Sequence, residues 1–194
     1  MKKAMWAARI HKIHKPLKIE RIPIPKIGPQ DVLLRVKACG ICHSDLHIMD
    51  GITRLPKYPM TIGHEFAGVI QDVGSEVKNW KAGGRVCIYS LIACGDCLFC
   101  LKGRDPLCLN RNILGVHTDG GYAEFVRVPA KCLVKLPEKI PFDQGAILTD
   151  AVATPFHAIV KRSQMKLGDS VAIFGIGGLG SHAVQIAKIN GAAK

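Results

Sequence analysis

The sequence predicts a mainly β domain followed by the first strand and helix of an α/β domain. Three observations lead to this prediction. Short apolar runs separated by glycine and proline turns fill most of residues 4–137. The apolar period then lengthens near residue 141, as expected where helices begin. An apolar run at 171–174 is followed by a glycine loop and a helical pattern. The predicted division is residues 1–157 for the β domain and 158–194 for an incomplete α/β domain.

Strands are expected wherever apolar and polar residues alternate between turns. The segments are 5–10, 17–22, 32–41, two short strands within 66–77, and then 83–90, 119–129 and 131–137. A short helix at 44–50 interrupts them and is closed by Gly51. Many short, closely spaced strands favour a β-barrel or sandwich.

Helices are expected at 141–150, opened by Pro141, and at 153–168. A strand at 170–174, a glycine loop and a helix at 179–190 would then form the first half of a β-α-β unit. A lone strand and helix cannot bury their apolar faces. We therefore expect one set of side chains to lie partly bare: Val171, Ile173, Leu179, Val184, Ile186 and Ile189.

The composition is that of an ordinary globular chain. Of 194 residues, 48% are hydrophobic and 22% charged, which argues against global disorder. The N-terminus has no signal-peptide pattern, and no run approaches a membrane span, so we expect a cytoplasmic protein with no membrane partner. The net charge of +12 could suit nucleic acid or a phosphate-rich cofactor. Lysine and arginine are scattered, however, so nucleic-acid binding is not favoured.

The most specific motif is a group of four cysteines with the spacing C-x2-C-x2-C-x7-C. They are Cys94, Cys97, Cys100 and Cys108. Four thiolates complete a tetrahedral zinc site and leave no open position, as in a structural zinc site. An iron–sulfur cluster is an alternative, although ferredoxin runs continue with a shorter interval. Disulfides or buried free thiols are the remaining alternatives.

A second group of metal-ligand residues is spread over two segments, "CGICHSDLH" at 39–47 and "TIGHEFAG" at 61–68. Cys42 and His64 are candidates for one catalytic zinc, which uses three protein ligands and keeps a position for water or substrate. Each segment alone is a weak signal, because a single cysteine is usually a small core residue.

Taken in order, the motifs resemble those of the zinc-containing medium-chain alcohol dehydrogenases. They are "CGICHSDLH", "GHEFAGVIQDVGSEV", the four-cysteine lobe, "DGGYAEFVRVP" and "GIGGLG". The resemblance covers essentially the whole chain and about the first half of a family member. It implies a GroES-like, partly open barrel and the start of a Rossmann domain. The intact enzyme would oxidise a primary or secondary alcohol to an aldehyde or ketone, with hydride transfer to NAD or NADP. It would hold two zinc ions per chain and form a homo-oligomer.

The resemblance also implies the ligands of the catalytic zinc. Cys42 and His64 match the first two family ligands, and Asp150 stands where many members carry cysteine. Some bacterial and archaeal members use aspartate there, and a helix N-cap is the plain alternative for Asp150. Glu65 resembles the family's carboxylate beside the metal. Asp45 resembles the carboxylate that orients the ligand histidine.

Four further residues resemble the family's proton path and coenzyme contacts. Ser44 could accept the alcohol proton, and His47 could pass it to water because imidazole titrates near neutrality. His43 matches a residue near the coenzyme pyrophosphate, and Thr154 matches one beside the nicotinamide.

The glycine loop is the candidate coenzyme site. It follows the pattern G-x-G-x-x-G between an expected strand and an expected helix, which is the context that the dinucleotide fingerprint requires. Its residues are Gly175, Gly177, Gly178, Leu179 and Gly180. The acidic residue that binds the ribose lies about 20 residues further on in such folds. We therefore expect a fragment with little activity alone, in which the sequence does not choose between NAD and NADP.

Two other functions remain open at this stage. One is a non-catalytic zinc-binding structural protein or a basic nucleic-acid-binding remnant, which would not need Ser44, His47 or Asp150. The other is the zinc-free quinone-reductase branch of the same superfamily, which would not need Cys42, His64 or the cysteine lobe.

Overall fold

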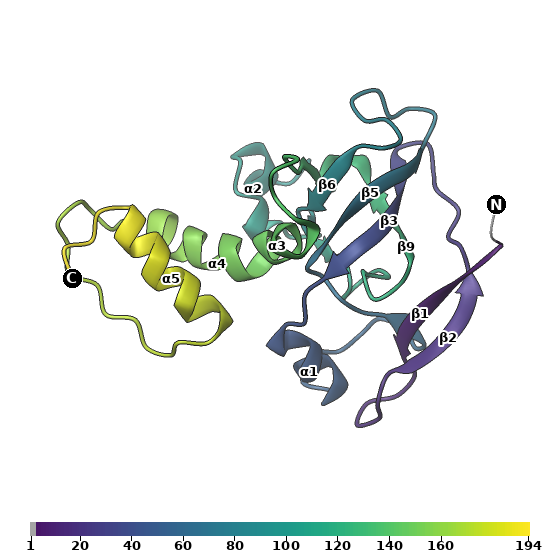
Figure 1. Cartoon of the computed structure of the whole chain (residues 1–194), viewed down its shortest axis with the longest axis horizontal. Coiled ribbons are helices and arrows are strands. Elements are labelled where there is room, and N and C mark those ends of the chain that lie inside the picture. The colour runs from purple at the N-terminus through teal and green to yellow at the C-terminus, as the bar shows by residue number, and fades with distance from the viewer. Residues whose placement is uncertain (1–2) are drawn as a thin grey trace.

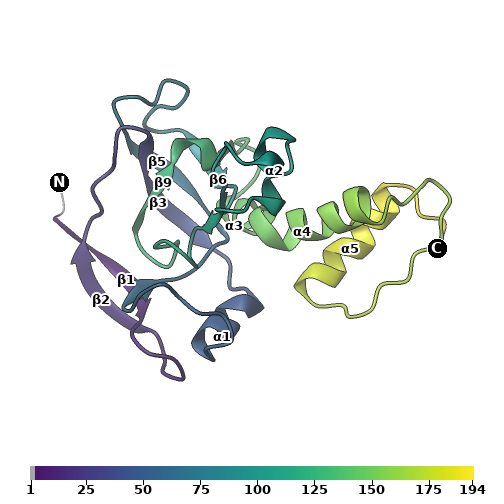
Figure 2. The same cartoon turned by 180° about the vertical axis from the view of Figure 1, so that it is seen from behind.

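The computed structural model describes residues 3–194 and shows a β domain from which a helical arm extends (Figure 1). The arm is formed by the continuous helical segment 142–162 and by a C-terminal helix packed alongside it, an arrangement seen from both sides (Figures 1 and 2). Among these residues, no helix combines the length and apolarity needed to cross a membrane. The predicted mainly β architecture is confirmed.

Three antiparallel sheets build the β domain. The five-stranded sheet has the order β10-β6-β5-β3-β9, the three-stranded sheet β2-β1-β4, and the two-stranded sheet β7-β8. An isolated bridge between Ala7 and Ala123 joins β1 to the segment before β9. The strands are β1 (Ala4–Ile10), β2 (Lys18–Pro23), β3 (Asp31–Cys39), β4 (Met60–Thr61), β5 (Phe66–Val73), β6 (Arg85–Ile88), β7 (Leu91–Ile92), β8 (Asn112–Ile113), β9 (Phe125–Pro129) and β10 (Leu133–Lys135).

The main core lies on one face of the five-stranded sheet. Alternate residues of β3 and β9 point into it, including Val32, Leu34, Val126 and Val128, because successive strand residues face opposite sides. Phe66, at the start of β5, is fully buried in the same cluster. One expectation is wrong here: residues 75–77 form no second strand after β5 but part of a turn, in which Val77 N–H donates to the Gly74 carbonyl (3.0 Å).

Short helices connect the sheets and form the arm. The first, α1 (His43–Met49), is followed by Gly51, whose φ of +76° favours glycine, as expected. The others are α2 (Leu98–Leu101), α3 (Phe142–Ile147), α4 (Ala153–Phe156), α5 (Gly178–Ile189), the 3₁₀ turns Asp105–Leu107 and Ala130–Cys132, and the π-helical segments Leu148–Val152 and His157–Arg162. The predicted division at residues 157 and 158 falls inside the continuous helical segment.

The strand expected at 170–174 is not formed. A strand needs a neighbouring strand to complete its hydrogen bonds, but within residues 3–194 this segment packs against α5 and lies beside the last two residues of the chain. Val171 N–H donates to the Lys194 carbonyl (2.9 Å), and Ala193 N–H donates to the Asp169 carbonyl (2.8 Å). Phe174 is 97% exposed.

The apolar side chains of the C-terminal segment are only partly bare. Ile186 is buried against Ile159 of the helical arm, contrary to expectation, because α5 packs on that arm. Leu179, Val184 and Ile189 remain exposed, and Val171 and Ile173 are half-buried.

Candidate metal centres

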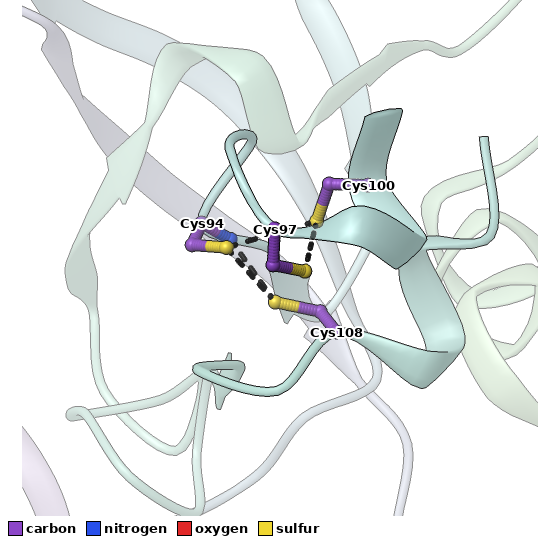
Figure 3. Close-up of side chains that lie close together, drawn as sticks. All are labelled: Cys94, Cys97, Cys100 and Cys108. Atoms are coloured by element: carbon purple, nitrogen blue, oxygen red, sulfur yellow. Dashed lines mark hydrogen bonds between the residues drawn. The ribbon is translucent and has the colours of Figure 1, made fainter. Parts of the chain in front are cut away.

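The four cysteines of the lobe converge on one point (Figure 3). The Sγ–Sγ distances are 3.4 Å for Cys94–Cys108, 3.5 Å for Cys97–Cys100 and 3.8 Å for Cys94–Cys100. A tetrahedral zinc with four thiolates would place its sulfurs about 3.8 Å apart. All four are free thiols, so the disulfide alternative is not what the structure shows. Thiolates of a multi-iron cluster bind different iron atoms and would lie further apart than ligands of one ion.

Without a cation, the pKa values of the cysteines in the lobe shift in opposite directions, so the four thiols do not all ionise together. Backbone N–H groups of Cys100 and Leu109 lower the pKa of Cys97 to about 6. The Gly95 backbone acts in the same direction on Cys100, but burial and the neighbouring thiols outweigh it and raise the pKa of Cys100 to about 12. Ionisation of the first thiol therefore disfavours ionisation of its neighbours. A bound divalent cation would offset the repulsion between the thiolates.

A second group joins four ligand-type residues from three parts of the chain. Cys42 caps α1, His64 and Glu65 lie between β4 and β5, and Asp150 lies in the π-helical segment 148–152. Their ligand atoms all lie within 4.8 Å of one another. His64 Nε2 is 3.3 Å from Asp150 Oδ2, which in turn is 3.8 Å from Cys42 Sγ. A tetrahedral ion bound by nitrogen, oxygen and sulfur needs edges of about 3.3–3.8 Å.

This second group is rich in acidic side chains, and two of its four members are buried while Cys42 and Asp150 are half-buried. His64 is 6% exposed and Glu65 3%. Burial alone would lower the pKa of His64, but the carboxylates of Asp150 and Asp45 outweigh it and raise that pKa to about 11. Burial and the Asp150 charge raise the pKa of Glu65. The side chains thus surround a place where positive charge is favoured, and a metal cation fits that requirement.

Two residues that sequence reasoning missed shape the same group. The Tyr122 hydroxyl donates to Asp45 Oδ2 (2.7 Å), on the carboxylate whose other oxygen faces His64 Nδ1 at 3.6 Å. A Cβ at Gly40 would overlap Glu65 Oε2, so only glycine leaves room for that carboxylate. Tyr122 lies in the segment 119–129, and nothing in the sequence indicated that its hydroxyl would contact Asp45, 77 residues earlier in the chain.

The predicted proton-path and coenzyme residues lie at different distances from this group. The Ser44 hydroxyl is 3.4 Å from His64 Nε2, and the Thr154 hydroxyl donates to Asp150 Oδ1. His43 and His47 pack edge to face, with ring centroids 4.8 Å apart. Ser44 and Thr154 therefore contact the ligand residues, whereas His43 and His47 contact each other.

The glycine loop has the backbone geometry that its pattern requires, although the strand before it is not formed. Gly175 has a φ of +88°, and a Cβ on Gly180 would overlap the Gly175 carbonyl oxygen. Gly177 is the N-cap of α5, Gly178 is its first residue, and Leu179 is 48% exposed. The free N–H groups of such a helix start favour an anion. The loop contributes to neither group of metal-ligand residues.

Gly63 precedes His64 and permits the approach of Tyr122. Its φ is +95°, and an added Cβ would lie 2.7 Å from Tyr122 Cδ1 and 3.0 Å from Cys39 Sγ. We expect Gly63→Ala to destabilise the fold by about 3 kcal/mol, because left-handed strain of about 1–2 kcal/mol adds to steric overlap. Urea unfolding would measure the loss.

Gly83→Ala is the matched control for this substitution. Gly83 also has a positive φ, +86°, but a Cβ there meets nothing within 4 Å. It should show only the conformational strain of about 1–2 kcal/mol. If the two variants lost the same free energy of unfolding, the close approach of Gly63 and Tyr122 would contribute nothing to the effect of Gly63→Ala.

The β domain matches a known protein family. The alcohol dehydrogenase GroES-like domain matches residues 28–138. An alcohol dehydrogenase of Geobacillus stearothermophilus is 44% identical over 189 residues, covering 96% of this chain and 56% of that protein. An NAD-dependent alcohol dehydrogenase of Sulfurisphaera tokodaii is 40% identical over 193 residues, covering 95% and 55%. The chain thus spans about half the length of the curated relatives it matches.

A solved structure gives the same result in three dimensions. The cobalt- and zinc-bound thermostable alcohol dehydrogenase of Pyrobaculum aerophilum superposes with a TM-score of 0.92 at 33% identity. The superposition covers 97% of this chain and 58% of that one. The resemblance expected from the motifs is therefore confirmed: this chain belongs to the alcohol dehydrogenase GroES-like domain family.

Proposed function

We propose that the whole protein is a zinc-dependent dehydrogenase that oxidises a primary or secondary alcohol with NAD or NADP, and that this chain carries its zinc-binding part. The observation behind the proposal is the convergence of Cys42, His64, Glu65 and Asp150 beside the Ser44 hydroxyl. In a purely structural zinc site, four protein ligands fill every coordination position, and the site needs no hydroxyl group beside it.

The donor set fits a zinc ion. Cys42, His64 and Asp150 would be its ligands, and the Glu65 carboxylate lies close enough to join them. Thiolate and carboxylate together balance the charge of Zn²⁺. A zinc ion held there supplies Lewis acidity, which lowers the pKa of an alcohol hydroxyl.

The chain's own residues would then move the released proton. The Ser44 hydroxyl lies 3.4 Å from His64 Nε2, at the edge of the ligand group, so it can accept a proton while giving up its own. His47 lies three residues further along α1 and is half-buried, so it could pass the proton to solvent.

The coenzyme would bind partly at the glycine loop. Gly175, Gly177, Gly178, Leu179 and Gly180 would receive the pyrophosphate at the start of α5. His43 would also approach the pyrophosphate, and Thr154 the nicotinamide. Residues 1–157 would form the catalytic domain and 158–194 the start of the coenzyme domain. The whole enzyme would work as a cytoplasmic homo-oligomer on a small alcohol or carbonyl compound, without nucleic acid.

Zinc analysis of the 194-residue chain tests the two sites. We expect two zinc ions per chain, one in the cysteine lobe and one in the mixed group. Asp150→Ala should lower the content to about one, because it removes one of only three protein ligands. Asp143→Ala, at an exposed aspartate in the first turn of α3, is the control and should keep two. One zinc ion in the unmodified chain, or no effect of Asp150→Ala, would contradict the mixed site.

An activity assay tests the rest. With NAD⁺ or NADP⁺ and a panel of short alcohols, we expect little or no turnover from the 194-residue chain alone, because it contains only part of a coenzyme site. Robust turnover would show that this chain is sufficient. Binding to DNA or RNA that weakens steeply with salt, together with a single zinc, would instead support the non-catalytic alternative.

A further inference from the structure

Tyr122 is held between the two segments that carry metal-ligand residues. Its N–H donates to the Ile62 carbonyl (3.0 Å), and its carbonyl accepts from Ala8 N–H (2.8 Å). Its ring lies directly over Gly63, as the 2.7 Å distance from an added Cβ to Tyr122 Cδ1 shows. The backbone and the ring of Tyr122 are therefore held in place by contacts that do not involve its hydroxyl.

The Tyr122 hydroxyl is directed at Asp45. It is 2.7 Å from Asp45 Oδ2 and 3.3 Å from the Gly40 carbonyl oxygen. A hydroxyl has one proton to donate, and the shorter distance assigns it to Asp45. Burial and the Asp45 charge raise the pKa of Tyr122, which keeps the hydroxyl protonated as a donor.

The Asp45 carboxylate is thereby held in one orientation. Its Oδ2 accepts from the Tyr122 hydroxyl and from Cys42 N–H (2.9 Å), so both donors are on one oxygen. The other oxygen, Oδ1, faces His64 Nδ1 at 3.6 Å. In the part of the chain that the structure describes, neither of these two buried atoms has a hydrogen-bond partner, and at 3.6 Å they form an ion-pair contact.

This arrangement decides which nitrogen of His64 is available to a metal. A neutral imidazole carries one proton, and a carboxylate facing Nδ1 keeps that proton there. Nε2, which points toward Asp150 Oδ2 3.3 Å away within the mixed ligand group, is then the nitrogen that would give up its proton to bind a metal.

We propose that Tyr122 is a positioning residue for the mixed metal site: its hydroxyl fixes the Asp45 carboxylate, and Asp45 in turn holds His64 with Nε2 toward the metal. This inference rests on the proposed function, because it assumes a metal in that group. Phenylalanine would keep the ring contact with Gly63 but leave Asp45 Oδ2 with only the Cys42 N–H. The carboxylate could then rotate away from His64.

The test uses the full 194-residue chain and the Tyr122→Phe variant. Competition with a chromophoric chelator measures the Zn²⁺ affinity of each site. We expect the mixed site to weaken about 10-fold, at the lower end of what the loss of an outer contact to a metal ligand costs. The cysteine lobe should be unchanged. Visible absorption of Co²⁺ in the mixed site should also shift, because it reports ligand geometry rather than overall stability.

Tyr58→Phe, at an exposed tyrosine, is the matched control and should leave both affinities unchanged. The route through Asp45 is tested by a double-mutant cycle. If Tyr122 acts through Asp45, then adding Tyr122→Phe to Asp45→Asn should weaken the mixed site no further.

The outcomes separate this inference from the proposed function. If the unmodified chain binds one zinc ion only, both are wrong. If it binds two, and Tyr122→Phe binds zinc with unchanged affinity and an unchanged Co²⁺ spectrum, only the role of Tyr122 is wrong. Additive losses in the double variant would likewise overturn the route through Asp45.

Discussion

Replacing Cys108 with serine is expected to remove one zinc ion per chain and to unfold the cysteine lobe, residues 93–111. Cys108 is fully buried, with its sulfur 3.4 Å from Cys94 Sγ. The lobe has little apolar material to hold it otherwise, because Leu98, Leu101 and Leu109 are all more than half exposed. A structural zinc contributes directly to folding, by about 10–16 kcal/mol in isolated zinc-finger peptides.

Two measurements check this expectation. Zinc analysis should fall from two ions to one, and limited proteolysis should cut within 93–111 much faster than in the unmodified chain. The β domain should keep its circular dichroism, since the lobe contributes only α2 and a 3₁₀ turn. Cys132→Ser is the control, because Cys132 is a buried thiol outside both ligand groups. A Cys108→Ser chain that kept two zinc ions and resisted protease would rule out the lobe as a zinc site.

The cysteine lobe was predictable from sequence because its ligands are close together in the chain. Spacings of two and seven residues leave the four sulfurs few ways to lie apart, and the structure brings all four together. The strands were predictable for a similar reason, since alternation of apolar residues is local.

The mixed group was not predictable from spacing alone. Asp150 lies 108 residues from Cys42, and only the resemblance to a family linked the two. The π-helical geometry of 148–152, a form often found at functional sites, left no mark in the sequence that we could read. Tyr122 and Gly40 were missed because their roles depend on contacts with Asp45 and Glu65 that exist only in the fold.

The strand expected at 170–174, which the structure does not form, shows that a local sequence pattern can also mislead. The run at 171–174 has the composition of a buried strand, but a strand is defined by its neighbour as well as its sequence. Within the described residues this run packs against α5 and forms a backbone hydrogen bond from Val171 to Lys194, so no strand is formed and Phe174 is left in solvent.

Truncating Phe66 to alanine is expected to cost the β domain about 3–5 kcal/mol, the usual loss for a phenylalanine removed from a well-packed core. Phe66 is fully buried among the residues of the main core, and its ring is packed closely against Gly121, where an added Cβ would lie 2.6 Å from Cδ1. Because β5 begins at Phe66, directly after His64 and Glu65, the cavity would also loosen the mixed ligand group. Urea unfolding and zinc analysis of the same preparations would measure both effects.

Phe174→Ala is the matched control, since it removes the same atoms from a side chain that is 97% exposed. It should change the free energy of unfolding by no more than about 0.5 kcal/mol, as surface substitutions usually do. If Phe66→Ala lost less than about 1 kcal/mol, the packing described for the main core would be wrong. If it lost the full amount but kept two tightly bound zinc ions, the mixed site would be held by the loop around His64 rather than by the start of β5.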